Sequence, residues 1–221
     1  MKTEEIVAEL QGLAEPKYRD FVASLIPGEA DLLGVRLPLL RKLARRVARQ
    51  EDWERIFYEL GSYSQMEMVI LRGMLPGYAP QATLTERLNA LRAFIPSIRN
   101  WSICDSCCAT YTFAREARAE VREFLLPYLR STAEYEARFA VVMLLNHYLN
   151  ESAYAEQVGE LLCQVHCRAY YADMAVAWCA CELILRYPPC EAELMAKLPP
   201  DRQKLTQRKI RESRRCGSKR K

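Results

Sequence analysis

The stretch Tyr135-Glu136-Ala137-Arg138-Phe139-Ala140-Val141-Val142-Met143-Leu144-Leu145 leads from a few charged residues into an almost wholly apolar run. The run contains neither proline nor glycine, and the whole chain has only eight glycines and no convincing alternating strand pattern. A helix that is apolar on nearly all sides must be covered by other elements. The stretch therefore predicts a helix buried among other helices.

Similar apolar helices are predicted at regular distances on both sides of this one. Four such segments, spaced by 33 to 40 residues, centre near Ile70, Cys104, Val142 and Ala177. More amphipathic helices are expected between them, over residues 83–95, 114–127 and 152–166. This period is typical of HEAT or armadillo units, which stack helix pairs at roughly 40 residues per unit. We expect an all-α helical repeat fold of this kind.

Prolines divide the chain into about a dozen helices of roughly 10 to 18 residues. Pro16 and Pro38 suit a first helical turn, and further breaks are expected at prolines that include Pro127. No internal linker is evident. We expect one repeat domain over residues 1–213, followed by a basic, disordered tail over residues 214–221.

Several protein classes are disfavoured by composition. The longest apolar runs, such as Phe139 to Leu145, are far shorter than the roughly 20 residues of a membrane span. The first residues include Glu4 and Glu5 where a signal peptide would be basic and apolar. We therefore expect no membrane association and a cytoplasmic location.

The nine cysteines do not form a disulfide framework, because their number is odd and most lie in apolar helical patterns. Cys163, Cys167, Cys179 and Cys181 are expected to be buried thiols that pack as small hydrophobic groups. The spacing from Cys104 to Cys107 and the Cys163 to Cys167 segment match neither a zinc site nor a redox motif in its usual context. We expect no metal and no cofactor.

The net charge of +4 hides an asymmetry. Residues 202–221 contain ten Lys or Arg against Glu212, a charge of +9, so residues 1–201 carry −5. Within that body, the segment from Arg36 to Arg49 has no acidic residue. Its basic residues are Arg36, Arg41, Lys42, Arg45, Arg46 and Arg49. A local basic face of this kind indicates phosphate binding, with an ordinary solvated helix face as the alternative.

Four side chains are candidates for chemistry. Trp101 precedes Asp105 by one helical turn, so both lie on one helix face, and Asn100 is a suitable N-cap. Arg138 begins the apolar run quoted above, and Trp178 ends the segment Tyr170 to Trp178. Structural roles are the alternatives: Arg138 could pair with Glu134 or Asp105, and tryptophans usually belong to the core.

At these residues the chain resembles the AlkD-like family of DNA alkylation repair proteins, from about Leu33 to Ser213. The matching segments occur in the order and spacing of the family. They are Leu33-Gly34-Val35-Arg36-Leu37-Pro38-Leu39-Leu40-Arg41, Asn100-Trp101-Ser102-Ile103-Cys104-Asp105, Arg138-Phe139-Ala140, Ala175-Val176-Ala177-Trp178 and Arg208-Lys209-Ile210-Arg211-Glu212. The resemblance implies a C-shaped superhelix of HEAT-like repeats with a concave DNA-binding face. It also departs from many base-excising members, which have a second aromatic and a second acidic residue where this chain has Asn100 and Ser102.

The resemblance implies a DNA glycosylase that hydrolyses the N-glycosidic bond of alkylated purines in duplex DNA. The family's functional residues would correspond to Trp101, Asp105, Arg138 and Trp178. Asp105 would stabilise the oxocarbenium-like sugar and position water, with both tryptophans beside the deoxyribose and Arg138 on a phosphate. Further DNA contacts would come from Arg36, Arg41, Lys42, Arg45, Arg46, Arg208, Lys209 and Arg211. We expect a monomer that associates with the nucleoid when it is bound to DNA.

Two other functions are compatible with the residues. A non-catalytic member of the same family would keep the basic face and Arg138 and bind particular DNA structures without excising bases. A HEAT-type adaptor would need neither Asp105 nor the basic helix, and would present apolar or acidic surfaces to a protein partner.

Overall fold

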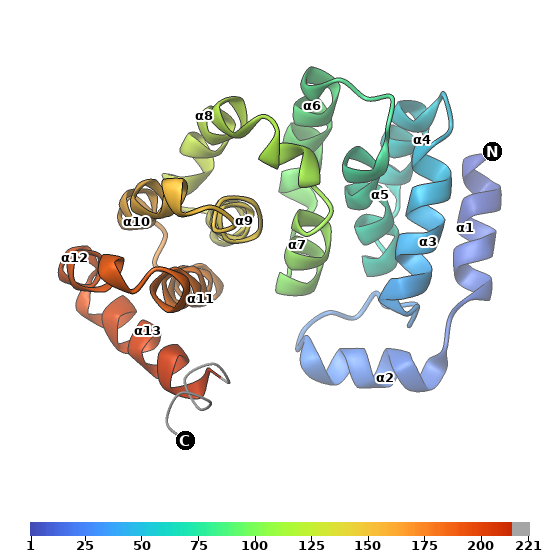
Figure 1. The fold of residues 1–221 in the computed structure, drawn as a ribbon. Helices are drawn as coiled ribbons and strands as arrows, with labels where there is room; N and C mark the ends of the chain where they lie inside the picture. Colours follow the sequence, from blue (N-terminus) through green and yellow to red (C-terminus); the bar gives the residue numbers. More distant parts are fainter. Residues whose placement is uncertain (214–221) are drawn as a thin grey trace. The chain divides into compact units, whose positions relative to one another are not determined.

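A computed structural model describes residues 1–213 of the chain (Figure 1). This part contains thirteen α-helices, five short 3-10 helices and no strand. The prediction of an all-α fold is confirmed. The predicted tail, residues 214–221, lies outside the described residues. None of the helices in residues 1–213 combines the length and apolarity that a bilayer crossing requires.

The helices form two compact units, of which the first extends from Met1 to Phe113. Its helices are α1 (Thr3–Gly12), α2 (Pro16–Leu25), α3 (Leu37–Ala48), α4 (Trp53–Glu59), α5 (Met66–Tyr78), α6 (Leu84–Phe94) and α7 (Trp101–Cys108). Alternate helices stack on one another, because α5 packs against both α3 and α7. In α5, every residue from Met66 to Pro76 is buried.

The second unit begins at Ala114. Its helices are α8 (Arg118–Leu129), α9 (Glu134–His147), α10 (Ala155–Cys163), α11 (Tyr170–Arg186), α12 (Glu191–Lys197) and α13 (Pro200–Glu212). Here α11 packs against both α9 and α13, while α8 covers α9 and α10 covers α11. The same alternate stacking therefore occurs in both units. That pattern agrees with the predicted helical repeat; its curvature and the single-domain organisation stay predictions.

The four predicted apolar helices are α5, α7, α9 and α11, and the amphipathic ones between them are α6, α8 and α10. Short 3-10 helices join several of these elements. They span Leu60–Ser62, Ile95–Ser97, Thr112–Arg115, Ser152–Tyr154 and Pro188–Cys190. The helix predicted to start at residue 114 therefore begins at Arg118, after one of these turns. A 3-10 turn has nearly the same apolar spacing as an α-helix, so the sequence pattern does not separate them.

Prolines mark helix starts better than helix ends in this chain. Pro16 and Pro38 lie in the first turn of α2 and α3, as predicted. The break expected at Pro127 is wrong, because Pro127 lies inside α8, two residues before its end. Pro76 lies in the same position relative to the end of α5. So close to a C-terminus, a proline removes one helical hydrogen bond and leaves the preceding turns intact.

Most cysteines are buried thiols, as predicted, and burial raises the pKa of Cys107, Cys108 and Cys179. Two details differ from the expectation. Cys163 is only half-buried, and Cys167 is buried but lies in the loop between α10 and α11. A small apolar side chain packs equally well from a helix or a loop. The burial of Cys167 was therefore predictable, but its position in a loop was not.

Candidate functional site

Trp101 and Asp105 lie one turn apart on the partly exposed face of α7. Both are half-buried, whereas Ile103 and Cys104 between them are fully buried. Asn100 is the N-cap, as predicted, since its side-chain oxygen accepts a hydrogen bond from the backbone nitrogen of Ile103 at 3.0 Å. The cap fixes the start of the helix, and Asp105 follows in the second turn, on the same face as Trp101.

A buried carboxylate that the sequence analysis did not identify holds the start of α7. Glu29, in the loop after α2, has a side chain only 6% exposed. It accepts hydrogen bonds from Asn100 Nδ2 at 2.7 Å and from Arg99 Nε and Nη2 at 3.0 Å each. Arg99 also donates to the carbonyl oxygen of Ser64 at 2.7 Å. Glu29 is therefore a positioning residue for the helix that carries Trp101 and Asp105.

The segment before α3 is shaped by a second buried carboxylate. Glu67 of α5 accepts hydrogen bonds from the backbone nitrogens of Leu33 (2.9 Å), Gly34 (2.7 Å) and Val35 (3.2 Å). Gly34 has a φ of +85°, and a Cβ there would lie 2.5 Å from the carbonyl oxygen of Glu15. Only glycine fits such a conformation and such an approach. The Gly-Val-Arg motif thus sets the direction in which α3 leaves the loop.

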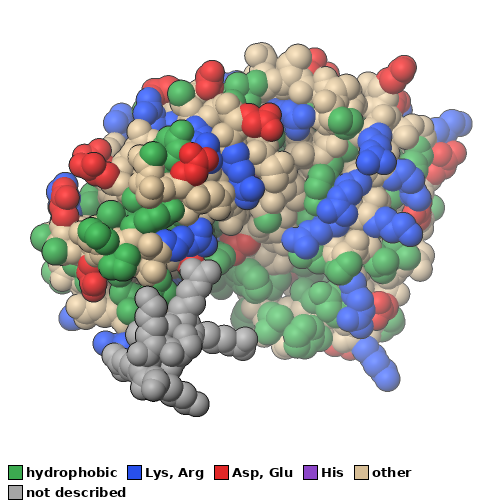
Figure 2. Space-filling model, viewed as in Figure 1, with side chains coloured by type: hydrophobic (Ala, Val, Ile, Leu, Met, Phe, Trp, Pro, Cys, Tyr) green, Lys and Arg blue, Asp and Glu red, His purple; other side chains and the backbone are tan. Residues whose placement is uncertain are grey.

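Helix α3 presents a basic face to solvent. Leu40, Leu43 and Val47 are buried on one side, and the opposite side is charged. Its exposed or half-exposed cations are Arg41, Lys42, Arg45 and Arg46, and the exposed Arg49 follows as the C-cap. Figure 2 shows Lys and Arg side chains gathered over this helix.

Acidic residues from α1 and from the start of α2 neutralise part of this face. Arg36 forms a bidentate ion pair with Glu15, at 2.8 and 2.9 Å, which lowers the pKa of Glu15. Arg46 pairs with Glu9. The guanidinium of Arg45 lies 4.8 Å from the ring centre of Tyr78.

No ion pair within residues 1–213 involves the other cations of the face. These are Arg41, Lys42, Arg45 and Arg49. The segment from Arg36 to Arg49 contains no acidic residue, but the fold places Glu9 and Glu15 against it.

Arg138 is buried in α9 with 6% of its surface exposed. Its Nη1 donates to the carbonyl oxygen of Tyr171 at 2.9 Å. Glu134, considered above as its ion-pair partner, instead accepts a hydrogen bond from the backbone nitrogen of Tyr171 at 2.6 Å. Both side chains of α9 therefore hold the first turn of α11, and this contact fixes the guanidinium of Arg138.

Trp178 is the most exposed of the three tryptophans, at 36%, whereas Trp53 is a core residue at 3%. It lines a surface pocket of about 320 Å³ between α11 and the C-terminal end of α9. The other lining residues are Leu145, Asn146, Asn150, Glu182 and Arg186. The alternative interpretation of Trp178 as a core residue does not hold.

The basic residues predicted in α13 are also accessible. Arg208 and Arg211 are exposed and Lys209 is half-exposed. Arg208 forms an ion pair with Glu212 at 2.8 Å, which raises the pKa of Arg208. Helix α13 itself is held by Arg202, which is 1% exposed and contacts Asp173 Oδ1 at 2.6 Å.

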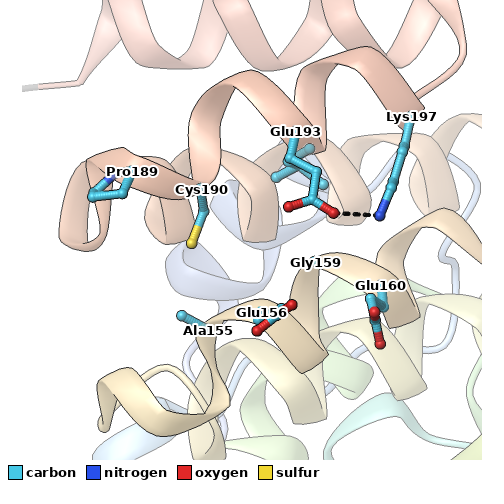
Figure 3. A pocket seen from close by; sticks show the side chains of 9 residues that line it. Ala155, Glu156, Gly159, Glu160, Pro189, Cys190, Glu193 and Lys197 are labelled. Carbon is cyan, nitrogen blue, oxygen red and sulfur yellow. Dashed lines mark hydrogen bonds and ion pairs between the residues drawn. The ribbon is translucent and has the colours of Figure 1, made fainter.

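A separate pocket of about 280 Å³ lies between α10 and α12 and contains none of the predicted site residues. Glu156, Glu160 and Glu193 line it, and Glu193 forms an ion pair with Lys197 at 2.5 Å (Figure 3). Its acidic lining makes it an unsuitable surface for phosphate.

The candidate residues are divided between the two units. Trp101, Asp105 and the basic face of α3 belong to the first unit, and Arg138, Trp178 and the basic residues of α13 belong to the second. A family model described as "DNA alkylation repair enzyme" matches residues 6–170. The match includes Trp101, Asp105 and Arg138, and it ends before Trp178 and α13. No curated protein and no solved structure matches the chain.

Proposed function

The chain belongs to the family of DNA alkylation repair enzymes, and from this premise we propose that it is a DNA glycosylase. Its substrate would be duplex DNA that carries purines methylated at N3 or N7. Methylation at these positions makes the base cationic, so the base is a good leaving group and needs little help from a general acid. The reaction depends instead on stabilising the positive charge that develops on the sugar.

The observation that carries this proposal is the arrangement of Trp101 and Asp105 on α7. A carboxylate one turn from a half-buried aromatic ring, on a helix whose start is fixed by Asn100 and Glu29, is suited to a preorganised electrostatic role. In this mechanism, Asp105 stabilises the oxocarbenium-like deoxyribose and orients the attacking water. The water adds to C1′ as the C1′–N bond breaks, its proton passes to solvent, and the base leaves neutral.

The remaining predicted residues would bind the DNA. Trp101 and Trp178 would lie against the deoxyribose and its neighbours, and Arg138 would contact a phosphate with an orientation already set by Tyr171. Arg41, Lys42 and Arg45 would add phosphate contacts in the first unit.

In the second unit, Arg208, Lys209 and Arg211 would do the same. Arg36 and Arg46 would first have to give up their ion pairs with Glu15 and Glu9, so we expect them to contribute less to DNA affinity.

The decisive experiment incubates the full-length protein with duplex DNA treated with a methylating agent. Released bases are then separated and identified. Release of 3-methyladenine or 7-methylguanine above the spontaneous rate supports the proposal. DNA binding without release would exclude it.

One observation favours a second candidate, a DNA-structure-binding protein without excision activity. Asn100 occupies a position where base-excising relatives often have another functional side chain. Here its side chain is engaged in the fold, with Ile103 at one end and Glu29 at the other. The base-release assay and a binding assay on the same DNA separate the two candidates.

A further inference from the structure

Tyr170 is the most exposed large apolar side chain among residues 1–213, at 67%. It is the first residue of α11. Its ring packs edge-on against the ring of Tyr171, with the two ring centres 5.1 Å apart. Single exposed apolar side chains are common on protein surfaces, so exposure alone assigns no role to Tyr170.

The ring of Tyr170 has a fixed support. Its neighbour Tyr171 is held by α9 in three ways. The backbone nitrogen of Tyr171 donates to Glu134 Oε1 at 2.6 Å, its carbonyl oxygen accepts from Arg138 Nη1 at 2.9 Å, and its ring stacks on Tyr135 with 5.8 Å between centres. A side chain whose surroundings are already ordered loses less entropy when it binds a partner. Tyr170 is therefore a preorganised contact, directly beside the residue that Arg138 holds.

Two cations of α13 lie next to Tyr170. A pocket of about 140 Å³ between α11 and α13 is lined by Tyr170, Met174, Leu205, Arg208, Lys209 and Glu212. Its lining has two cations against one carboxylate, a net charge of +1. Lys209 forms no ion pair within residues 1–213, and Arg208 is paired only through Nε with the exposed Glu212. Exposed pairs of this kind stabilise little, so both cations are available to an anion that binds beside the Tyr170 ring.

Tyr170 also shares one stripe of α11 with the candidate residue Trp178. Met174 and Trp178 follow Tyr170 at intervals of four residues, and side chains at this spacing lie on one face of a helix. All three are at least partly exposed. The stripe is about 12 Å long, because each residue of a helix rises about 1.5 Å. This length corresponds to about three to four nucleotides of one DNA strand, at about 3.4 Å per nucleotide.

We propose that Tyr170 is a further DNA-contacting residue, whose ring packs against a deoxyribose while Arg208 and Lys209 bind the adjacent phosphate. The inference rests on the proposed function, since DNA is taken as the ligand. Tyrosine suits this place, because its ring is apolar and its hydroxyl donates hydrogen bonds to phosphate or sugar oxygens. The positive charge beside the ring favours the DNA backbone over an uncharged partner. The contact extends the site along the strand from Trp178 and requires no base to leave the duplex.

The first test uses undamaged duplex DNA, so that it does not depend on excision. The full-length protein is labelled with fluorotyrosine, and the ¹⁹F signal of Tyr170 is assigned as the one lost in Tyr170→Phe. We expect this signal to shift saturably as the duplex is added. No shift on addition of DNA would overturn the proposal. So would a shift that depends on protein concentration without DNA, because it would identify a second copy of the chain as the partner.

The second test compares the affinity and the salt dependence of variants. Tyr170→Ala should weaken DNA binding roughly tenfold. The slope of log K against log [salt] should stay as in wild type, because a neutral side chain releases no counterion. Arg208→Ala should instead flatten the slope by about 0.9.

Tyr58→Ala is the matched control for Tyr170→Ala. Tyr58 is 56% exposed, and its ring packs edge-on against the neighbouring Phe57, also with 5.1 Å between ring centres. This variant should bind DNA like wild type. An equal loss of affinity in Tyr58→Ala would contradict a specific contact at Tyr170.

Thermal unfolding accompanies the binding data. Tyr170→Ala should unfold near the wild-type temperature, because the side chain is mostly exposed. Wild-type affinity in this variant, or a salt slope lowered as far as in Arg208→Ala, would overturn the proposal. Should Tyr170→Ala fail to fold, the ¹⁹F titration of the otherwise unchanged protein decides by itself.

Failure of the proposed function gives a different result from failure of this inference. If the protein releases no methylated base but the Tyr170 signal shifts with DNA and Tyr170→Ala binds more weakly, excision fails and the contact stands. If the protein releases base while Tyr170→Ala binds DNA like wild type, only the contact at Tyr170 fails.

Discussion

The charge on Asp105 is the feature that a single substitution can remove without changing the shape of α7. In Asp105→Asn, we expect base release at saturating DNA to fall by roughly tenfold to a thousandfold, the effect of losing one preorganised electrostatic group. DNA affinity should hold or rise slightly, because a negative charge that faces phosphates is gone. Single-turnover base release and a binding titration on the same preparation measure both quantities.

A purely structural Asp105 gives a different outcome for the same variant. If the carboxylate served only to neutralise Arg138, its loss would leave a buried charge and cost about 3–5 kcal/mol of stability. Thermal unfolding of Asp105→Asn therefore accompanies the kinetics. Asp20→Asn, which alters a carboxylate that is 72% exposed in the same unit, is the matched control. A stable, DNA-binding Asp105→Asn that excises at the wild-type rate would end the catalytic assignment.

Glu29 is expected to act through the position of α7. In Glu29→Gln the side chain loses its charge and presents an amide N–H₂ group to a site filled with donors from Arg99 and Asn100. We expect a loss of about 1.5–3 kcal/mol in the free energy of unfolding, the range for hydrogen bonds to charged groups. Base release should fall as well, with rescue by Glu29→Asp only in part. Urea denaturation gives the first quantity, and an unaltered midpoint would show that Glu29 does not hold the helix.

Among the elements, α3 offers a test of the basic face that uses its own ion pairs as a control. Arg41, Lys42 and Arg45 form no ion pair within residues 1–213, so each can release a DNA counterion on binding. Changing all three to Ala should flatten the slope of log K against log [salt] by about 0.9 per lost contact.

The Arg36→Ala variant should change the slope less, because this guanidinium is held by Glu15. Equal slopes for the triple variant and wild type would identify α3 as a solvated face without a role in binding.

The helices were predictable because their signal is local. Apolar spacing located α5, α7, α9 and α11, and Asn100 was identified as a cap from the residues that follow it. The interactions that position the site are not local. Glu29 lies about 70 residues from Arg99, and Glu67 lies more than 30 residues from Gly34. A carboxylate so far away in the sequence is not part of any periodic pattern. The sequence therefore predicted the candidate residues but not the buried carboxylates that position them.

On the scale of the whole molecule, charge is unevenly distributed along the chain. We therefore expect the helices and the C-terminal residues to contribute differently to DNA binding. Residues 1–201 carry −5 and residues 202–221 carry +9. Removing residues 214–221, which contain five Lys or Arg, changes the net charge from +4 to −1 (4 − 5). Long-range attraction between protein and DNA depends on such totals and is screened by salt.

Deletion of residues 214–221 should therefore weaken DNA binding and slow association, most strongly at low salt, and reduce the salt slope. Base release at saturating DNA should be unchanged, because Trp101, Asp105 and Arg138 all precede the deletion. Stopped-flow association at several salt concentrations, with single-turnover base release at saturation, separates the two effects. A collapse of base release at saturating DNA, in a protein that unfolds at the wild-type temperature, would mean that these residues belong to the active site. An unchanged association rate would mean that the α3 face and α13 account for the attraction to DNA without them.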